Sequence, residues 1–231
     1  MATLMAVFAH PDDETFICGG SLAKYAAQGH RVVLVCATKG EMGRRMGVPP
    51  IATRETIAKL REDELSRACW ELHVAQLEWL NLRDKTLEIQ SFDTLTDSVL
   101  RLIELEQPQV VVTFHEKLGG HPDHCTIGGA AAAATLRYRE KSGRDVRLFF
   151  VAWPGMARDP QTYGLSPEQF VEVDVSAHLA EKLRAYRAHK TQSQLNAWLW
   201  KSDAVSMQRL PSTEYFIQAD KPIQRRKSLL E

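Results

Sequence analysis

Two short clusters of histidines and acidic residues stand out in this sequence of 231 residues. The first is His10-Pro11-Asp12-Asp13-Glu14, and the second is His121-Pro122-Asp123-His124. Imidazoles and carboxylates crowded beside a buried strand repel one another and lose solvation, and a divalent cation removes that penalty. A catalytic zinc takes three nitrogen or oxygen ligands from protein and leaves a position for water. The two clusters therefore predict one metal site with a carboxylate to spare.

The residue types suggest how the clusters divide the work. We expect the metal to lie on two imidazoles and one carboxylate, those of His10, Asp13 and His124. Asp12 is then free to accept a proton from a water, as a general base. Each cluster alone has a simpler interpretation: acids that complement a helix N-terminus in the first case, and surface histidines on a loop in the second. Both clusters follow predicted strands, and this shared position favours the metal site.

The elements that must position these clusters alternate between strand and helix. Strands separated by helices predict an α/β fold with a mostly parallel sheet covered on both faces. We expect one domain over residues 1–231, with a C-terminal elaboration from about residue 155 and a loosely ordered tail after Asp220. The predicted strands are 3–9, 31–37, 77–80, 110–114, 147–153 and 170–175; the predicted helices are 19–29, 53–72, 92–105, one that contains 130–134, and 179–189.

Composition excludes several classes of function. Lys plus Arg equals Asp plus Glu at 29 each, which argues against nucleic-acid binding through bulk charge. The N-terminal apolar run has no basic region before it and is too short for a signal peptide or a membrane span. The four cysteines form no C-x-x-C pair. We therefore expect a cytoplasmic protein with a small-molecule substrate and neither nucleic acid nor membrane as a partner.

The motifs resemble a known family. AHPDDE near the start and HPDH near position 120 are similar to the two signatures of the PIG-L/LmbE-like N-deacetylases. The segments GGSL, TKGE and LREDE follow in the family's order, and KTQSQ after the last predicted helix is similar too. The stretches GEMGRRMG, ATRET and NLRDK look most like the bacillithiol-biosynthesis branch. That branch removes the acetyl group from N-acetylglucosaminyl-malate.

The resemblance implies a Rossmann-like fold and an oligomer of identical subunits. It implies zinc on the residues that match the family's ligands, with iron(II) also able to use the same set. Asp12 would be the general base. His121, an imidazolium favoured and oriented by Asp123, would stabilise the oxyanion or protonate the leaving amine. These roles fall on the three metal ligands His10, Asp13 and His124 and the three catalytic residues Asp12, His121 and Asp123.

Substrate contacts also follow from the resemblance. Arg61 would reach sugar hydroxyls or an attached anion, although an exposed ion pair between Arg61 and Glu64 would explain both residues more simply. Glu41 and Asp84 match acidic positions that bind sugar hydroxyls. Arg44 could bind the malate carboxylates, because a guanidinium fork suits that geometry.

Two other functions remain open at this stage. One is a deacetylase that acts on a different N-acetyl amino sugar. The other is a non-haem iron oxygenase, because two histidines and one carboxylate also describe its metal site. Oxygenases of that type usually have a β-barrel scaffold, whereas this sequence alternates strands and helices.

Overall fold

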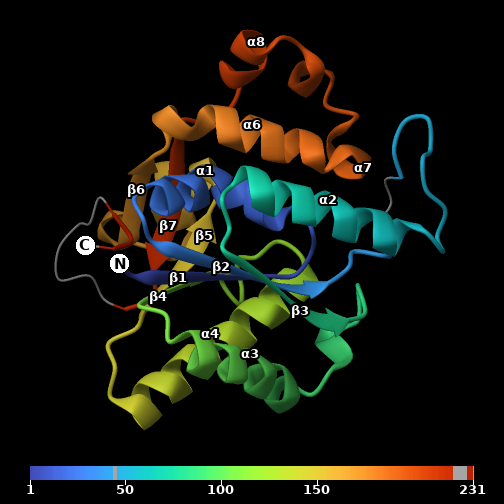
Figure 1. Ribbon diagram of the computed structural model, residues 1–231. Helices are drawn as coiled ribbons and strands as arrows, with labels where there is room; N and C mark the ends of the chain where they lie inside the picture. Colours follow the sequence, from blue (N-terminus) through green and yellow to red (C-terminus); the bar gives the residue numbers. More distant parts are fainter. Residues whose placement is uncertain (44–45, 221–227, 231) are drawn as a thin grey trace.

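The computed structural model describes residues 1–43, 46–220 and 228–230. A seven-stranded sheet runs through the molecule in the order β3-β2-β1-β4-β5-β7-β6 (Figure 1). The strands are β1 Thr3–Phe8, β2 Arg31–Thr38, β3 Gln76–Leu82, β4 Val110–Thr113, β5 Arg147–Ala152, β6 Phe170–Asp174 and β7 Thr213–Gln218.

The pairing of the strands confirms the predicted sheet. β1 pairs in parallel with β2 and β4, and the pairs β2/β3 and β4/β5 are parallel as well. β7 is antiparallel to both β5 and β6. β4 is buried along its whole length, and β1 and β2 are buried after their first residues. Strands covered on both faces are nearly continuous apolar runs, which is why the sequence revealed them.

Helices cover both faces of the sheet. α3 and α4 pack together on one face, while α1, α2 and α6 lie on the other, with α8 outside them (Figure 1). The helices are α1 Asp13–Ala27, α2 Ile57–Glu71, α3 Phe92–Glu106, α4 Pro122–Ser142, α5 Pro154–Arg158, α6 Leu179–Ala188, α7 Lys190–Ser193 and α8 Asp203–Met207. No helix in the described part of the chain is long and apolar enough to span a bilayer.

The strand order creates a place for a ligand. From β1 the chain moves outward through β2 to β3, and it then returns to the other side of β1 to add β4. In open α/β sheets, ligands bind beyond the carboxyl ends of the strands at such a reversal. The clusters that begin at His10 and His121 follow β1 and β4, so the fold brings both to this point.

Three features of the fold differ from the prediction. α1 begins at Asp13, six residues before the predicted start at Gly19, and it is kinked at Cys18, where φ is −139°. β7 was not predicted, and it joins the C-terminal elaboration to the main sheet. The loosely ordered tail falls largely on residues 221–227 and 231, which lie outside the described residues; Leu229 is buried, and its N–H donates to the Tyr25 hydroxyl at 2.8 Å.

Candidate metal centre and active site

The two motif clusters meet at the reversal point. Asp13 is the first residue of α1, directly after the turn that leaves β1. His121 caps the N-terminus of α4, where its Nδ1 accepts the N–H of Asp123 at 3.1 Å, and Pro122 occupies the first helical turn. Proline is favoured there because its missing N–H would have no partner within the helix. The capping arrangement holds the second cluster against the first.

Three of the side chains form a compact group of potential ligands. The ligand atoms of His10, Asp13 and His124 all lie within 4.8 Å of one another. His124 Nε2 is 3.2 Å from His10 Nδ1 and 3.2 Å from Asp13 Oδ1. Asp13 Oδ2 is 3.6 Å from His10 Nδ1 and also accepts the backbone N–H of His10 at 2.9 Å. The predicted metal ligands therefore come together.

The hydrogen bonds of His10 and His124 indicate which ring nitrogens carry protons and which carry lone pairs. His124 Nδ1 contacts the carbonyl of Gly119 at 2.9 Å, so this nitrogen carries the proton. His10 Nε2 contacts Asp84 and Asp123, each at 3.1 Å, and therefore carries a proton too. The neutral rings thus direct two lone pairs at each other across 3.2 Å. Lone pairs in that position need a cation between them, so the donor set fits a metal such as zinc.

The charges of the group agree with that conclusion. Burial alone would lower the pKa of His10, but hydrogen bonds to Asp123 and Asp84 outweigh it and raise the pKa to about 10. Burial would raise the pKa of Asp13, but the neighbouring His124 lowers it to about 2. In the absence of a metal, a proton would thus take the position between the rings, and a divalent cation would replace it.

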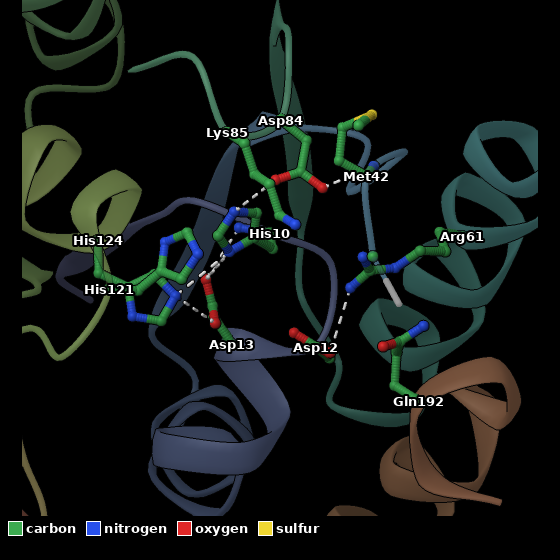
Figure 2. A pocket seen from close by; sticks show the side chains of 11 residues that line it. His10, Asp12, Asp13, Met42, Arg61, Asp84, Lys85, His121, His124 and Gln192 are labelled. Carbon is green, nitrogen blue, oxygen red and sulfur yellow. Dashed lines mark hydrogen bonds and ion pairs between the residues drawn. The ribbon is translucent and has the colours of Figure 1, made fainter. Parts of the chain in front are cut away.

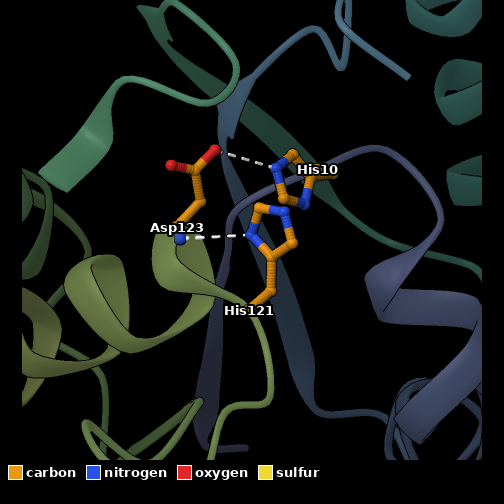
Figure 3. Close-up of side chains that lie close together, drawn as sticks. All are labelled: His10, His121 and Asp123. Carbon is orange, nitrogen blue, oxygen red and sulfur yellow. Dashed lines mark hydrogen bonds and ion pairs between the residues drawn. The ribbon is translucent and has the colours of Figure 1, made fainter. Parts of the chain in front are cut away.

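Asp123 differs from the role expected of it, the orientation of His121. The Asp123 carboxylate accepts from His10 and from the backbone N–H groups of Lys85 (2.7 Å) and Leu87 (3.2 Å), while only its own N–H contacts His121 (Figure 3). Asp123 therefore orients His10 directly and His121 only through the backbone. Carboxylates behind a ligating histidine fix its tautomer and raise its basicity.

His121 also differs from the expected imidazolium. Burial and the neighbouring charges of His10 and His124 lower its pKa. Its Nδ1 accepts the Asp123 N–H, so the neutral ring carries its proton on Nε2. The ring of His121 lies edge-on to that of His10, with centroids 5.1 Å apart. His121 is thus a neutral N–H donor beside the three ligands.

Asp12 lies outside the group formed by His10, Asp13 and His124. Its Oδ2 accepts from Arg61 Nη2 at 3.1 Å, on the side of the pocket away from His124 (Figure 2). Burial raises the pKa of Asp12 to about 6, although the charge of Arg61 opposes the shift. A carboxylate with such a pKa is ionised at neutral pH and still basic enough to accept a proton.

The predicted substrate contacts separate into three cases. Arg61 and Asp84 line the pocket. Glu41 lies behind Asp84, whose backbone N–H donates to Glu41 Oε1 at 3.0 Å. Arg44 lies outside the described residues. The alternative of an exposed Arg61–Glu64 pair is wrong, because both side chains are buried and Glu64 instead binds Thr191.

The pocket has a volume of about 430 Å³ and includes residues that the sequence did not reveal. Lys85 points into it beside His10, and Gln192 approaches from α7 at the opposite wall (Figure 2). Lys85 stands three residues after the end of β3 within NLRDK, and Gln192 lies within KTQSQ, both segments that carried the family resemblance. Those segments were the signal available for both residues.

Comparison with known proteins decides the family. Residues 5–135 match the family model PIG-L, described as GlcNAc-PI de-N-acetylase. The chain belongs to the PIG-L family. It is accordingly a metal-dependent N-deacetylase, a hydrolase that acts on N-acetylated amino sugars. This membership and the α/β fold exclude the iron oxygenase considered above.

Curated relatives fall into two groups with different names. A Bacillus subtilis protein named "Probable N-acetyl-alpha-D-glucosaminyl L-malate deacetylase 2" is 37% identical over 83% of this chain and 83% of its own length. An Actinosynnema mirum protein named 1D-myo-inositol 2-acetamido-2-deoxy-alpha-D-glucopyranoside deacetylase is 33% identical over 82% of this chain and 80% of its own. Both names describe a deacetylase of a glucosamine conjugate, and they differ in the group attached to the sugar.

Solved structures confirm the fold. The N,N′-diacetylchitobiose deacetylase of Pyrococcus horikoshii aligns with a TM-score of 0.65 at 22% identity, covering 94% of this chain and 83% of its own. The 4-carboxy-2-hydroxymuconate hydratase of Pseudomonas putida aligns with a TM-score of 0.72 at 16% identity, covering 99% and 100%. The same fold thus occurs in proteins described as a deacetylase and as a hydratase, and the fold alone does not specify the reaction.

Proposed function

We propose that this protein removes the N-acetyl group from N-acetylglucosaminyl-malate, the substrate of bacillithiol biosynthesis, with zinc held by His10, Asp13 and His124. The substrate rests on three Bacillus relatives with 32–37% identity and that activity in their names. Relatives named for an inositol conjugate are 28–33% identical. Deacetylation of another amino-sugar conjugate is therefore the second candidate.

One observation carries the proposal. The lone pairs of His10 and His124 converge with the Asp13 carboxylate, and the Asp12 carboxylate lies beside this group without belonging to it. Zinc in that position would polarise the acetamide carbonyl and lower the pKa of a nearby water. Asp12 then accepts the proton of the attacking water, since it is ionised at neutral pH and faces the same pocket. Its ion pair with Arg61 keeps the carboxylate directed into the pocket.

His121 completes the chemistry from the other side. Its Nε2–H is available to donate to the oxygen that becomes negative during attack. A fixed donor at such an oxygen contributes roughly 3 kcal/mol to the rate in comparable sites. The proton gained by Asp12 can then pass to the departing nitrogen, which leaves as an amine.

Lys85 suggests how a malate group would be recognised. It is a largely exposed cation at the rim of the pocket, and the described residues provide no acidic partner for its amino group. Its backbone has φ of +61° and donates its N–H to Asp123, so the site itself holds the lysine in place. An ammonium group there suits a carboxylate on the aglycone. Arg44 stays a predicted second cation, and Asp84 and Glu41 stay predicted contacts to sugar hydroxyls.

The direct test is a panel of three substrates with zinc-loaded protein. Amine release is measured from N-acetylglucosaminyl-malate, from the inositol conjugate of N-acetylglucosamine and from free N-acetylglucosamine. We expect kcat/KM to be highest for the malate conjugate by about 100-fold over the free sugar, the effect of about 2.7 kcal/mol of added transition-state binding. A higher kcat/KM for the inositol conjugate would mean that the natural substrate carries inositol and not malate. Release of no amine from any of the three substrates would refute the proposed reaction.

A further inference from the structure

The backbone of Asp12 adopts an unusual conformation. Its φ is 117° and its ψ is −27°, a region that residues with a side chain rarely occupy. Such a conformation costs about 1–3 kcal/mol and persists only where surrounding contacts hold it. The Asp12 side chain makes no capping hydrogen bond to α1, so other groups must hold the turn.

Glu14 makes the contact that holds this turn. Its Oε2 accepts the backbone N–H of Asp12 at 3.0 Å, across two residues of sequence. Its other oxygen, Oε1, accepts from the hydroxyl of Thr15 at 2.5 Å and from His189 Nε2 at 2.7 Å. Glu14 is only 1% exposed. A carboxylate that is buried to this extent is costly without hydrogen-bond donors. The position of the Glu14 carboxylate therefore depends on the positions of its three donors.

His189 reaches Glu14 from a distant part of the chain. It follows α6 and is fully buried, and its Nδ1 has no hydrogen-bond partner in the described part of the chain. Among the described residues, Glu14 is therefore the hydrogen-bond partner of this ring. Glu64 fixes Thr191, two residues after His189, because it accepts both the N–H and the hydroxyl of Thr191, at 2.8 and 2.6 Å. The C-terminal elaboration thus reaches the turn that carries Asp12.

We propose that Glu14 and His189 are positioning residues, which hold the backbone of Asp12 so that its carboxylate faces the attacking water. His189 hydrogen-bonds to Glu14, and it is neither one of the predicted metal ligands nor one of the residues that line the pocket. This inference rests on the proposed function, because it gives Asp12 the role of base. It extends the active site into residues beyond the segment 5–135 that matches the family model.

The test compares two buried pairs that join α1 to the C-terminal elaboration. His189→Phe removes the donor to Glu14 while keeping an aromatic ring. The control is Lys182→Met, because Lys182 Nζ lies 2.5 Å from Glu214, whose oxygens accept the N–H groups of Gly20 and Ser21. Both substitutions remove a fully buried cationic or polar partner, and the control pair does not contact Asp12. His189→Gln restores an N–H donor and serves as the rescue variant.

We expect His189→Phe to lower kcat about 100-fold, the effect of a small misplacement of a catalytic group, with KM and bound zinc unchanged. Lys182→Met should lower the melting temperature but keep kcat, and His189→Gln should recover most of the lost kcat. Wild-type kcat in His189→Phe, or no recovery in His189→Gln, would overturn the proposal. If His189→Phe does not fold, His189→Met against His189→Gln provides the same comparison of donor with no donor.

The outcomes also separate this proposal from the proposed function. If the wild-type protein releases no amine from any substrate in the panel, the reaction is wrong and kcat cannot be compared. If the wild type is active and His189→Phe is equally active, the reaction stands and only the positioning role fails.

Discussion

Arg61 Nη2 lies 3.1 Å from Asp12 Oδ2, and this contact joins α2 to the turn that follows β1. Nη1 of the same guanidinium donates to the carbonyl of Gly40 at 2.8 Å, and Nη2 also donates to the carbonyl of Pro11. The arginine is 3% exposed, so solvent cannot replace these partners. Removing one member of such a buried pair leaves the other charge uncompensated. The orientation of the Asp12 carboxylate therefore depends on the position of the Arg61 guanidinium.

Gly40→Ala should displace the Arg61 guanidinium. Gly40 has φ of +62°, and an added Cβ would lie 1.9 Å from Arg61 Nη1. Because the guanidinium must move, we expect kcat to fall about 10- to 100-fold. Gly143→Ala is the matched control, since Gly143 has φ of +67° with nothing within 4 Å of the added atom. The control should lose about 1 kcal/mol of stability without losing kcat. Equal kcat in the two variants would show that Arg61 does not position the base.

Asp12→Asn tests the base itself. The substitution keeps the shape of the side chain but removes the group that accepts a proton. We expect kcat to fall about 10²- to 10⁴-fold while bound zinc, measured by elemental analysis, stays at the wild-type level. Asp63→Asn, at a half-buried position where the side chain pairs with Lys59, is the control and should keep full activity. A nearly wild-type rate in Asp12→Asn would assign the base to another group.

Local sequence patterns predicted most of the fold. The buried strands β1, β2 and β4 are continuous apolar runs, so their positions were clear. The start of α1 was missed because its first turn consists of the polar residues that form the site, and the kink at Cys18 separates it from the apolar remainder. β7 was missed because it includes Glu214, a buried charge whose partners Lys182, Gly20 and Ser21 are distant in the sequence.

The same distinction applies to the site. The ligand group and Asp12 were predicted because their types and spacing are informative within short segments. Lys85, Gln192 and His189 were not, because each gains its role only when segments that are far apart in the sequence come together. The contact of Asp123 with His10 could not be predicted either, since sequence proximity favoured His121 and only the packing of α4 against the turn after β1 decides the partner.

Zinc binding should release protons. With its pKa raised to about 10, His10 of protein stripped of metal is protonated at pH 7, and zinc must displace that proton. The raised pKa of His124 acts in the same direction. We expect zinc to bind more weakly as pH falls and to release about one to two protons, seen by calorimetry in buffers of different ionisation enthalpy. Identical heats in all buffers would contradict the ligand set.

Two variants accompany that measurement. His124→Ala removes one of the three ligands and should abolish tight zinc binding. His178→Ala is the control, because His178 lies between β6 and α6 and is not part of a group of possible metal ligands among the described residues. Tight binding of one zinc by His124→Ala would show that the metal lies elsewhere.

Lys85→Met should change substrate preference more than catalysis. If Lys85 binds a carboxylate of the malate group, its loss removes an attraction that the uncharged inositol conjugate never had. We expect KM for the malate conjugate to rise about 10- to 100-fold, the value of about 1.4–2.7 kcal/mol, with kcat nearly unchanged. Activity on the inositol conjugate should stay the same. Lys85→Arg keeps the charge and should restore a low KM, whereas an equal loss on both conjugates would mean that Lys85 supports the site through its backbone contact with Asp123 instead.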